Sequence, residues 1–305
     1  MHPSETLPTL PCYLNGTLTT VDQARVSVLD RGFIFGDGVY EVVPVYGQRP
    51  FRFDDHMARL ERSLNAVRIP PPMPAPQWRQ VVLDLIAAHI DQQRASGHPD
   101  PMSQPRLVYL QVTRGVALRD HLMPADIAPT VFAMVSPMKP PSARDREAGV
   151  ACVSAEDFRW HKGQIKSTSL LGAILARAIS ADAGAAETVL FRDGHLTEAA
   201  ACNVWVVRDG AVCGPPRDHW VLEGIRYGLI ESLCREADIP FQLRRIRRDE
   251  VLSADEILLS SATKEVLPVT RLDGRPVGHG AAAGRPGPVY ARLYAGYQRL
   301  KDSAG

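Results

Sequence analysis

Lys166 is the residue in this sequence that is best suited to act as an amine nucleophile. It lies in the run Gly163–Leu171, between an isoleucine and a serine-rich segment that predicts the start of a helix. A partly buried lysine has a lowered pKa, so its neutral amine becomes available to attack a carbonyl carbon. Seen alone, a lysine at a helix start is most often a solvated side chain. The chemistry assigned to Lys166 therefore depends on the residues that accompany it.

Glu198 is a single acid in the run Leu196–Asn203, where small residues follow it. We interpret this run as lying between strands. Small side chains leave room for a flat ring to pack close to the carboxylate, which could pair with a protonated ring nitrogen. The alternative interpretation is an ordinary acid in a turn.

Arg119 and His121 are two hydrogen-bond donors separated by one residue. They follow a predicted strand and a turn at Arg114-Gly115. Two donors at this spacing in a loop could hold a carboxylate, and an arginine could do so in bidentate fashion. A solvated loop is the alternative.

Three further segments could contact a phosphate group. Arg59 lies on the polar face of a predicted helix, and Gly224–Arg226 opens another helix whose free amides could hold an anion. Ser260–Thr263 ends a strand with three hydroxyl groups.

Gly36-Asp37-Gly38 is not a dinucleotide-binding loop, because the third glycine is missing and a strand-like sequence follows.

The elements that must position these residues are mixed strands and helices. Asn15-Gly16, Asp193-Gly194 and Asp209-Gly210 predict tight turns, the first of them in a hairpin. The predicted strands cover residues 39–46, 106–113, 131–135, 150–155, 188–192, 203–208 and 256–260. The first predicted helix is capped by Asp54 and Asp55, and the second carries Val81 to Ile90. The third follows Ser169 and has an apolar stripe (Leu170, Leu171, Ile174, Leu175, Ala178). The fourth begins at Gly224, and the last spans Pro288 to Leu300. The proline-rich stretch Pro70–Pro76 predicts a loop.

The chain length and composition predict two domains. A chain of 305 residues is long enough for about two domains. Residues 137–146 contain three prolines, a lysine and two arginines, which we interpret as a linker between a small domain at 1–136 and a larger one at 147–305. Strands and helices do not alternate regularly, so we expect α+β domains.

Composition excludes several classes of protein and site. The formal net charge is +1, so no strong global field attracts nucleic acid or a membrane. The five cysteines are scattered and never form a CxxC pair, which argues against a disulfide framework or a metal site. Residues 1–11 lack the features of a signal peptide, and no apolar stretch approaches the ~20 residues of a membrane span. We expect a cytoplasmic protein.

Several of these segments, in this order, resemble the class IV (fold-type IV) pyridoxal-phosphate aminotransferases, and the D-amino acid transaminases among them most. The resemblance runs from about Tyr13 to Asp273. Its most specific pieces are Asp30–Val43, Gln111–Gly115, Ile165–Ser167 with Leu170–Ala173, and Thr197-Glu198 with Asn203-Val204.

The resemblance implies a role for each matching residue. Lys166 matches the catalytic lysine, which holds pyridoxal 5′-phosphate as a Schiff base and moves a proton between the substrate Cα and the cofactor. Glu198 matches the acid that pairs with the pyridine nitrogen, and Leu222 matches a leucine packed on the ring. The matching phosphate-binding residues are Arg59, Ile225, Arg226 and Thr263. The matching substrate-binding residues are Tyr40 and the carboxylate-binding pair Arg119 and His121, which distinguishes D-amino acid transaminases from their branched-chain relatives.

The resemblance also implies a fold, an activity and an assembly. The fold would have a small N-terminal α/β domain and a larger C-terminal β-barrel-like domain with helices. The activity would be ping-pong transamination of D-amino acids, such as D-alanine and D-glutamate, with 2-oxoglutarate or pyruvate as acceptor. A homodimer is expected. The alternatives on this fold are 4-amino-4-deoxychorismate lyase and branched-chain L-aminotransferase. A non-catalytic cofactor carrier or structural protein is a further alternative of another class.

The sequence departs from the family pattern at two places. Ala199–Cys202 replaces a hydroxyl-rich run, so hydrogen bonds near the ring could be fewer. Arg226 stands where a threonine is expected, so only its backbone N–H could serve as that threonine does.

Overall fold

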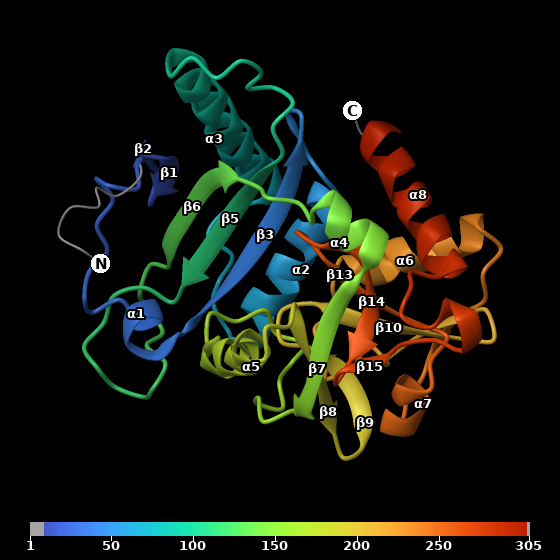
Figure 1. Ribbon diagram of the computed structural model, residues 1–305. Coiled ribbons are helices and arrows are strands. Elements are labelled where there is room, and N and C mark those ends of the chain that lie inside the picture. The colour runs from blue at the N-terminus through green and yellow to red at the C-terminus, as the bar shows by residue number, and fades with distance from the viewer. Residues whose placement is uncertain (1–8, 304–305) are drawn as a thin grey trace. The chain divides into compact units, whose positions relative to one another are not determined.

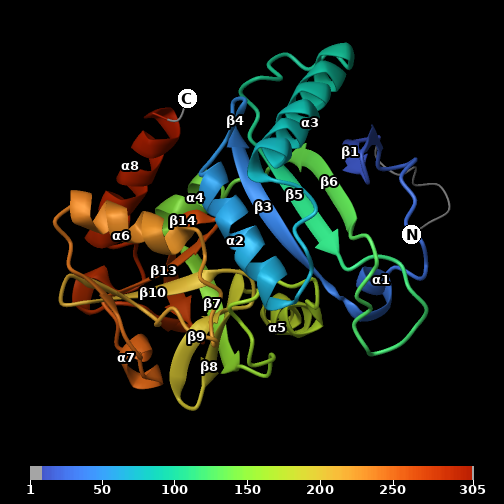
Figure 2. The ribbon, with the colours of Figure 1, turned by 180° about the vertical axis from the view of Figure 1, so that it is seen from behind.

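The computed structural model describes residues 9–303, which form two compact units (Figures 1 and 2). The first unit holds the chain up to Lys139 together with the short segment Ile165–Ser169, and the second holds Pro140–Gln164 and Leu170–Ser303. Lys166 therefore belongs to the first unit, although the chain has already entered the second. Residues 1–8, on which the prediction of no signal peptide largely rests, lie outside the described residues.

The first unit is built on a six-stranded antiparallel sheet in the order β2-β1-β6-β5-β3-β4. Its strands are β1 (Pro11–Leu14), β2 (Thr17–Thr20), β3 (Gly38–Tyr46), β4 (Arg49–Pro50), β5 (Arg106–Thr113) and β6 (Thr130–Pro137). The predicted hairpin is confirmed: Leu14 pairs with Thr17, and Asn15 and Gly16 both have positive φ, as a two-residue type I′ turn requires.

Two long helices pack on this sheet (Figure 1), and a short helix α1 (Arg31–Phe35) precedes β3. They are α2 (Phe53–Ala66) and α3 (Ala75–Ala95). The predicted cap was wrong: Arg52 is the N-cap of α2, and Asp54 and Asp55 lie in its first turn. At that position the positive end of the helix dipole stabilises their carboxylates. The predicted proline loop ends two residues earlier than expected, because Pro76 fits within the first turn of α3.

The second unit is built on a mixed nine-stranded sheet in the order β12-β11-β10-β13-β14-β7-β8-β9, with β15 paired to β14. Its strands are β7 (Val150–Glu156), β8 (Glu187–Arg192), β9 (His195–Ala199), β10 (Asn203–Arg208), β11 (Ala211–Gly214), β12 (Phe241–Leu243), β13 (Glu256–Ser261), β14 (Glu265–Leu272) and β15 (Arg275–Pro276). Glu198 lies within β9 and not between strands as predicted. The run His195–Ala199 has few β-branched residues, so its strand character comes from burial and pairing with β8.

The helices of the second unit are α4 (Ala143–Ala148), α5 (Leu171–Asp182), α6 (Arg226–Glu236), α7 (Arg248–Leu252) and α8 (Pro288–Ser303), with a short 3₁₀ helix at Gly280–Ala282. The buried face of α6 includes Leu229, Ile230 and Leu233. All five cysteines are buried free thiols. Within residues 9–303, no helix combines the length and apolar character that crossing a membrane requires.

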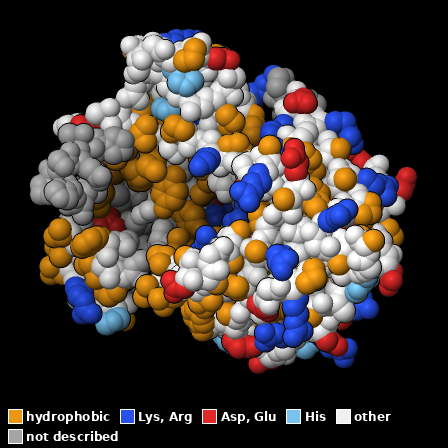
Figure 3. All heavy atoms as spheres, viewed as in Figure 1, with side chains coloured by type: hydrophobic (Ala, Val, Ile, Leu, Met, Phe, Trp, Pro, Cys, Tyr) orange, Lys and Arg blue, Asp and Glu red, His pale blue; other side chains and the backbone are white. Residues whose placement is uncertain are grey.

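The predicted apolar stripe of α5 exists but does not join the core of its unit. Leu171, Ile174 and Leu175 are 69%, 62% and 51% exposed, whereas the buried residues of the helix are Ala176 and Ser180. Figure 3 shows hydrophobic side chains gathered over the region of α5. A continuous exposed apolar face of this kind is typical of a contact surface.

Candidate active site

In the first unit, Lys166 lies directly against Tyr40. The segment carrying Lys166 pairs with β3: the Tyr40 N–H donates to the Lys166 carbonyl at 3.0 Å, and Val39 forms an antiparallel bridge with Ser167. The half-buried Lys166 side chain then places Nζ 4.1 Å from the centroid of the Tyr40 ring. The structure thus brings together the predicted nucleophile and a predicted substrate-binding residue.

Hydrogen bonds on both sides of Lys166 fix this segment. The Lys166 N–H donates to Ser63 Oγ on α2 at 3.3 Å, and the Thr168 N–H donates to the Gly38 carbonyl at 2.9 Å. Gly38 has to be glycine, because a Cβ there would lie 2.8 Å from the Val112 carbonyl oxygen and 3.2 Å from Thr168 Oγ1. The amine of Lys166 therefore projects from a backbone that is held at several points.

Arg59 lies one helical turn before Ser63 and is oriented by a buried acid. Its Nε and Nη2 contact Glu41 Oε1 and Oε2 at 2.7 and 2.8 Å, and His56 Nδ1 lies 2.7 Å from Oε2. Burial of Glu41 would raise its pKa, but the Arg59 guanidinium and His56 together hold that pKa well below the ordinary value. Arg59 is thus a fixed cation on the helix that also anchors the Lys166 segment.

Arg119 and His121 gather on one aromatic side chain, Phe35. The guanidinium carbon of Arg119 lies 5.6 Å from the centroid of the Phe35 ring, and the His121 ring lies 5.5 Å from it. The two predicted carboxylate-binding residues therefore share a common support in the first unit.

In the second unit, Glu198 is a buried carboxylate with a donor at each oxygen. Arg159 Nη1 contacts Oε1 at 2.8 Å, and the Leu222 N–H and Asn203 Nδ2 donate to Oε2 at 3.2 and 3.3 Å. Burial raises the pKa of Glu198, and the Arg159 guanidinium offsets part of that rise. Leu222, predicted to pack on a ring, thus also contacts the acid through its backbone.

Arg159 is a residue that the sequence interpretation missed. Its Nε and Nη2 each contact Asp157 at 2.9 Å, and Asp157 also accepts a hydrogen bond from Thr197 Oγ1 at 2.9 Å. The arginine is therefore clamped between two carboxylates, and its pKa is raised. The pattern Asp-x-Arg shortly before Lys166, together with Thr197 beside Glu198, is the only hint in the sequence, and no spacing rule connects these distant segments.

The start of α6 meets the turn between β13 and β14. Ile225 is the N-cap of α6, and Arg226 is its first residue. Arg226 Nε donates to the Ser261 carbonyl at 3.2 Å, while Ser261 Oγ and Thr263 Oγ1 lie 3.3 Å apart. The Arg226 side chain therefore connects the helix start to the hydroxyl-rich turn, and the predicted phosphate-binding residues of this unit lie close together.

Gly224 and Asn203 hold that helix start next to Glu198. A Cβ on Gly224 would lie 2.1 Å from Asn203 Oδ1, so any larger residue there would displace the Asn203 side chain. Asn203 Nδ2 in turn donates to the Leu222 carbonyl at 3.0 Å as well as to Glu198. The acid, Leu222 and the start of α6 thus form one hydrogen-bonded set.

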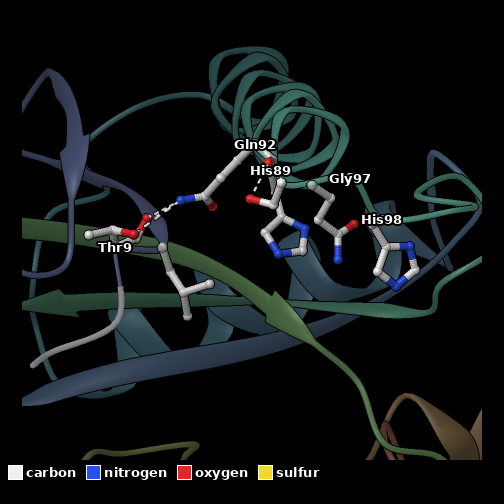
Figure 4. A pocket seen from close by; sticks show the side chains of 8 residues that line it. Thr9, His89, Gln92, Gly97 and His98 are labelled. Carbon is white, nitrogen blue, oxygen red and sulfur yellow. Dashed lines mark hydrogen bonds between the residues drawn. The ribbon is translucent and has the colours of Figure 1, made fainter. Parts of the chain in front are cut away.

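A hollow of about 420 Å³ in the first unit lies outside these sets (Figure 4). It lies between α3 and the residues that precede β1, and no predicted site residue lines it. Gln92 donates to Thr9, and Arg106 Nε donates to His89 Nδ1 at 3.0 Å. Burial lowers the pKa of His89 to about 4, so this histidine is neutral near pH 7. We assign no chemistry to this hollow.

Comparison with known proteins identifies the family. The family Amino-transferase class IV matches residues 38–272, most of the chain. The chain is 35% identical to the D-alanine aminotransferase of Bacillus licheniformis over 90% of its own length and 91% of that protein. It is 32% identical to the D-alanine aminotransferase of Staphylococcus haemolyticus over 95% and 98% of the two chains. The chain belongs to the class IV aminotransferases.

A solved structure confirms the fold that the sequence predicted. The branched-chain amino acid aminotransferase of Escherichia coli superposes with a TM-score of 0.82 over 96% of this chain and 95% of that one, at 23% identity. At this identity the similarity establishes the fold alone. It confirms the predicted α+β, fold-type IV architecture, whereas the family match and the D-alanine aminotransferase relatives confirm the aminotransferase class.

Proposed function

We propose that this aminotransferase transfers the amino group of D-amino acids, such as D-alanine and D-glutamate, to 2-oxo acids such as 2-oxoglutarate or pyruvate. The observation that carries the proposal is the pair Arg119 and His121 supported by Phe35, because two donors held on one ring can bind an α-carboxylate. The D-alanine aminotransferases similar to this chain support the same substrate class.

We propose pyridoxal 5′-phosphate as the cofactor, and the residues present fit it. Glu198 is a buried carboxylate that Arg159 stabilises in its ionised form, as pairing with a protonated ring nitrogen requires. When bound, the cofactor supplies an electron sink for charge that develops at the substrate Cα. Lys166 would hold its reactive carbon and Leu222 would pack on its ring. The phosphate would be held by Arg59, Ile225, Arg226 and Thr263.

Lys166 would transfer the proton, and the pair Arg119 and His121 would bind the substrate carboxylate. Lys166 Nζ, fixed beside the Tyr40 ring, takes the proton from the substrate Cα when it is a neutral amine. Arg119 and His121 hold the substrate carboxylate and so determine which face of Cα is turned toward Lys166. The D preference follows from the side on which the carboxylate is held.

A panel of D- and L-amino acids tests the substrate class. With 2-oxoglutarate as acceptor, D-alanine should give pyruvate at a rate at least ~100-fold above that for L-alanine, because a mirror-image substrate cannot place its carboxylate and Cα–H together. Product formation is followed as glutamate, which 2-oxoglutarate yields with every amino donor, and as pyruvate for the alanine substrates. Preference for branched-chain L-amino acids would identify the protein as a branched-chain L-aminotransferase instead. Pyruvate from 4-amino-4-deoxychorismate alone, without turnover of D-alanine, would assign it to the lyase.

We propose that the protein is a homodimer and that a second copy covers the apolar face of α5. The exposed residues of this face are Leu171, Ile174 and Leu175. In a two-fold symmetric dimer the same face is available on both subunits, so one apolar helix face can pack against another.

A charge on this face should separate the subunits. Leu175→Glu should shift the protein from dimer to monomer in sedimentation velocity, because a carboxylate would be buried unpaired in an apolar contact. Leu252→Glu is the matched control, since Leu252 is a similarly exposed leucine (47%, against 51% for Leu175) on α7. A Leu175→Glu protein that remains dimeric would show that another surface forms the interface.

A further inference from the structure

Arg31 on the short helix α1 reaches the loop that carries Arg119 and His121. Its Nη1 donates at 2.6 Å to the carbonyl of Asp120, the residue between the two. Its Nε forms an ion pair with Asp37 Oδ2 at 2.8 Å, and the Arg31 side chain is only 5% exposed. A buried, charge-paired donor thus holds the centre of the carboxylate-binding segment.

Phe35, one helical turn after Arg31, completes this support. The Arg31 guanidinium carbon lies 4.7 Å from the centroid of the Phe35 ring, and Arg119 lies 5.6 Å from the same centroid. His121 contacts this ring as well. A cation over an aromatic face is attracted by the ring quadrupole, so the ring restricts the positions that the guanidinium of Arg119 can take.

The backbone at the base of the loop is joined to the residues around α1. The Arg31 N–H donates to the Gly115 carbonyl at 2.9 Å, and Asp30 forms an antiparallel bridge with Val116. Asp37 also pairs with Arg114 at 2.8 Å. The base of the loop is therefore fixed independently of Arg31 Nη1 and Phe35, which act further along, at Arg119 to His121.

We propose that Arg31 and Phe35 are positioning residues that hold Arg119 and His121 in the arrangement that binds the substrate carboxylate. This inference rests on the proposed function. Ordering a long side chain before binding removes an entropic cost that binding would otherwise carry. Loss of the support should therefore weaken substrate binding more than it slows the chemical step.

Phe35→Leu and Phe35→Tyr test this role. Phe35→Leu should raise KM about tenfold for both D-alanine and 2-oxoglutarate, because both carry an α-carboxylate; this corresponds to about 1.4 kcal/mol. The value of kcat should stay within about threefold, and the ratio of D-alanine to L-alanine turnover should fall. Phe35→Tyr keeps the ring and should restore both KM values.

Arg31→Lys is the second variant, and Arg79→Gln is the control. Lysine keeps a positive charge for Asp37, but its single ammonium group cannot replace the Arg31 guanidinium, which contacts Asp37 and the Asp120 carbonyl together. Arg31→Lys should therefore raise both KM values, as Phe35→Leu does. Arg79→Gln removes a comparable cation–ring contact, 4.4 Å from the centroid of Phe53, away from the Arg119 loop, and should change neither KM. Unchanged KM values in Phe35→Leu and Arg31→Lys, or equal impairment of the Leu and Tyr variants, would overturn the inference. A wild-type protein that turns over no amino acid would overturn the proposed function and this inference together.

Discussion

Replacing Lys166 with alanine should lower kcat/KM for D-alanine by at least ~10⁴-fold, the largest effect that we expect from a single substitution. The substitution removes the amine that would hold the cofactor and, with it, the base that would take the Cα proton. General base catalysis alone contributes up to ~10⁴-fold. Lys166 Nζ is the amine that lies beside the Tyr40 ring, 4.1 Å from its centroid.

Covalent attachment separates this effect from simple unfolding. After borohydride reduction, the wild-type protein should retain the cofactor through denaturation, and the Lys166→Ala protein should lose it. Lys162→Ala is the matched control, because Lys162 is an exposed lysine in the same stretch of chain. A visible absorption band that is equally sensitive to borohydride in wild type and Lys166→Ala would exclude Lys166 as the attachment residue.

The strands and helices could be predicted where local patterns and tertiary packing agree. The predicted bounds of β5 match the observed ones, Arg106–Thr113, because a proline-containing loop precedes the segment and its β-branched and aromatic residues favour a strand. β9 was missed because His195–Ala199 has no strong local preference and becomes a strand through its partner β8. The α5 stripe was read correctly from the sequence, but periodicity does not say whether an apolar face is covered by the same chain.

The candidate site could be predicted where short, distinctive segments carry it. Lys166 and Glu198 each lie in a run that resembles the family, so both were named from the sequence. Arg159 and Asp157 were not, because their role depends on a contact with a strand that follows much later in the chain. The same reason applies to Arg31 and Phe35, whose sequence motif was recognised but whose contacts with the Arg119 loop appear only after folding.

Replacing Glu198 with glutamine should lower kcat by about 10²–10³-fold, the size of effect seen when one preorganised electrostatic partner is removed from an active site. Glutamine keeps the shape of the side chain, but it has a single acceptor oxygen and so can accept from Arg159 or from the Leu222 N–H, not from both. It has no charge with which to hold a proton on the ring nitrogen. Glu236→Gln, an exposed acid on α6, is the matched control and should leave kcat unchanged. Equal kcat values for wild type and Glu198→Gln would show that the acid has no electrostatic role.

The Arg159 contact predicts how this loss should depend on pH. The Arg159 guanidinium lowers the pKa of Glu198 against the effect of burial. Removing the cation in Arg159→Gln therefore raises that pKa, so a higher pH is needed before Glu198 is ionised. The acid limb of the kcat profile should move to higher pH, with the largest loss of activity at low pH and partial recovery as the pH rises. The Glu198→Gln variant has no carboxylate to titrate and should show no such recovery. If both variants lose activity equally at every pH, Arg159 only shapes the site and does not keep Glu198 charged.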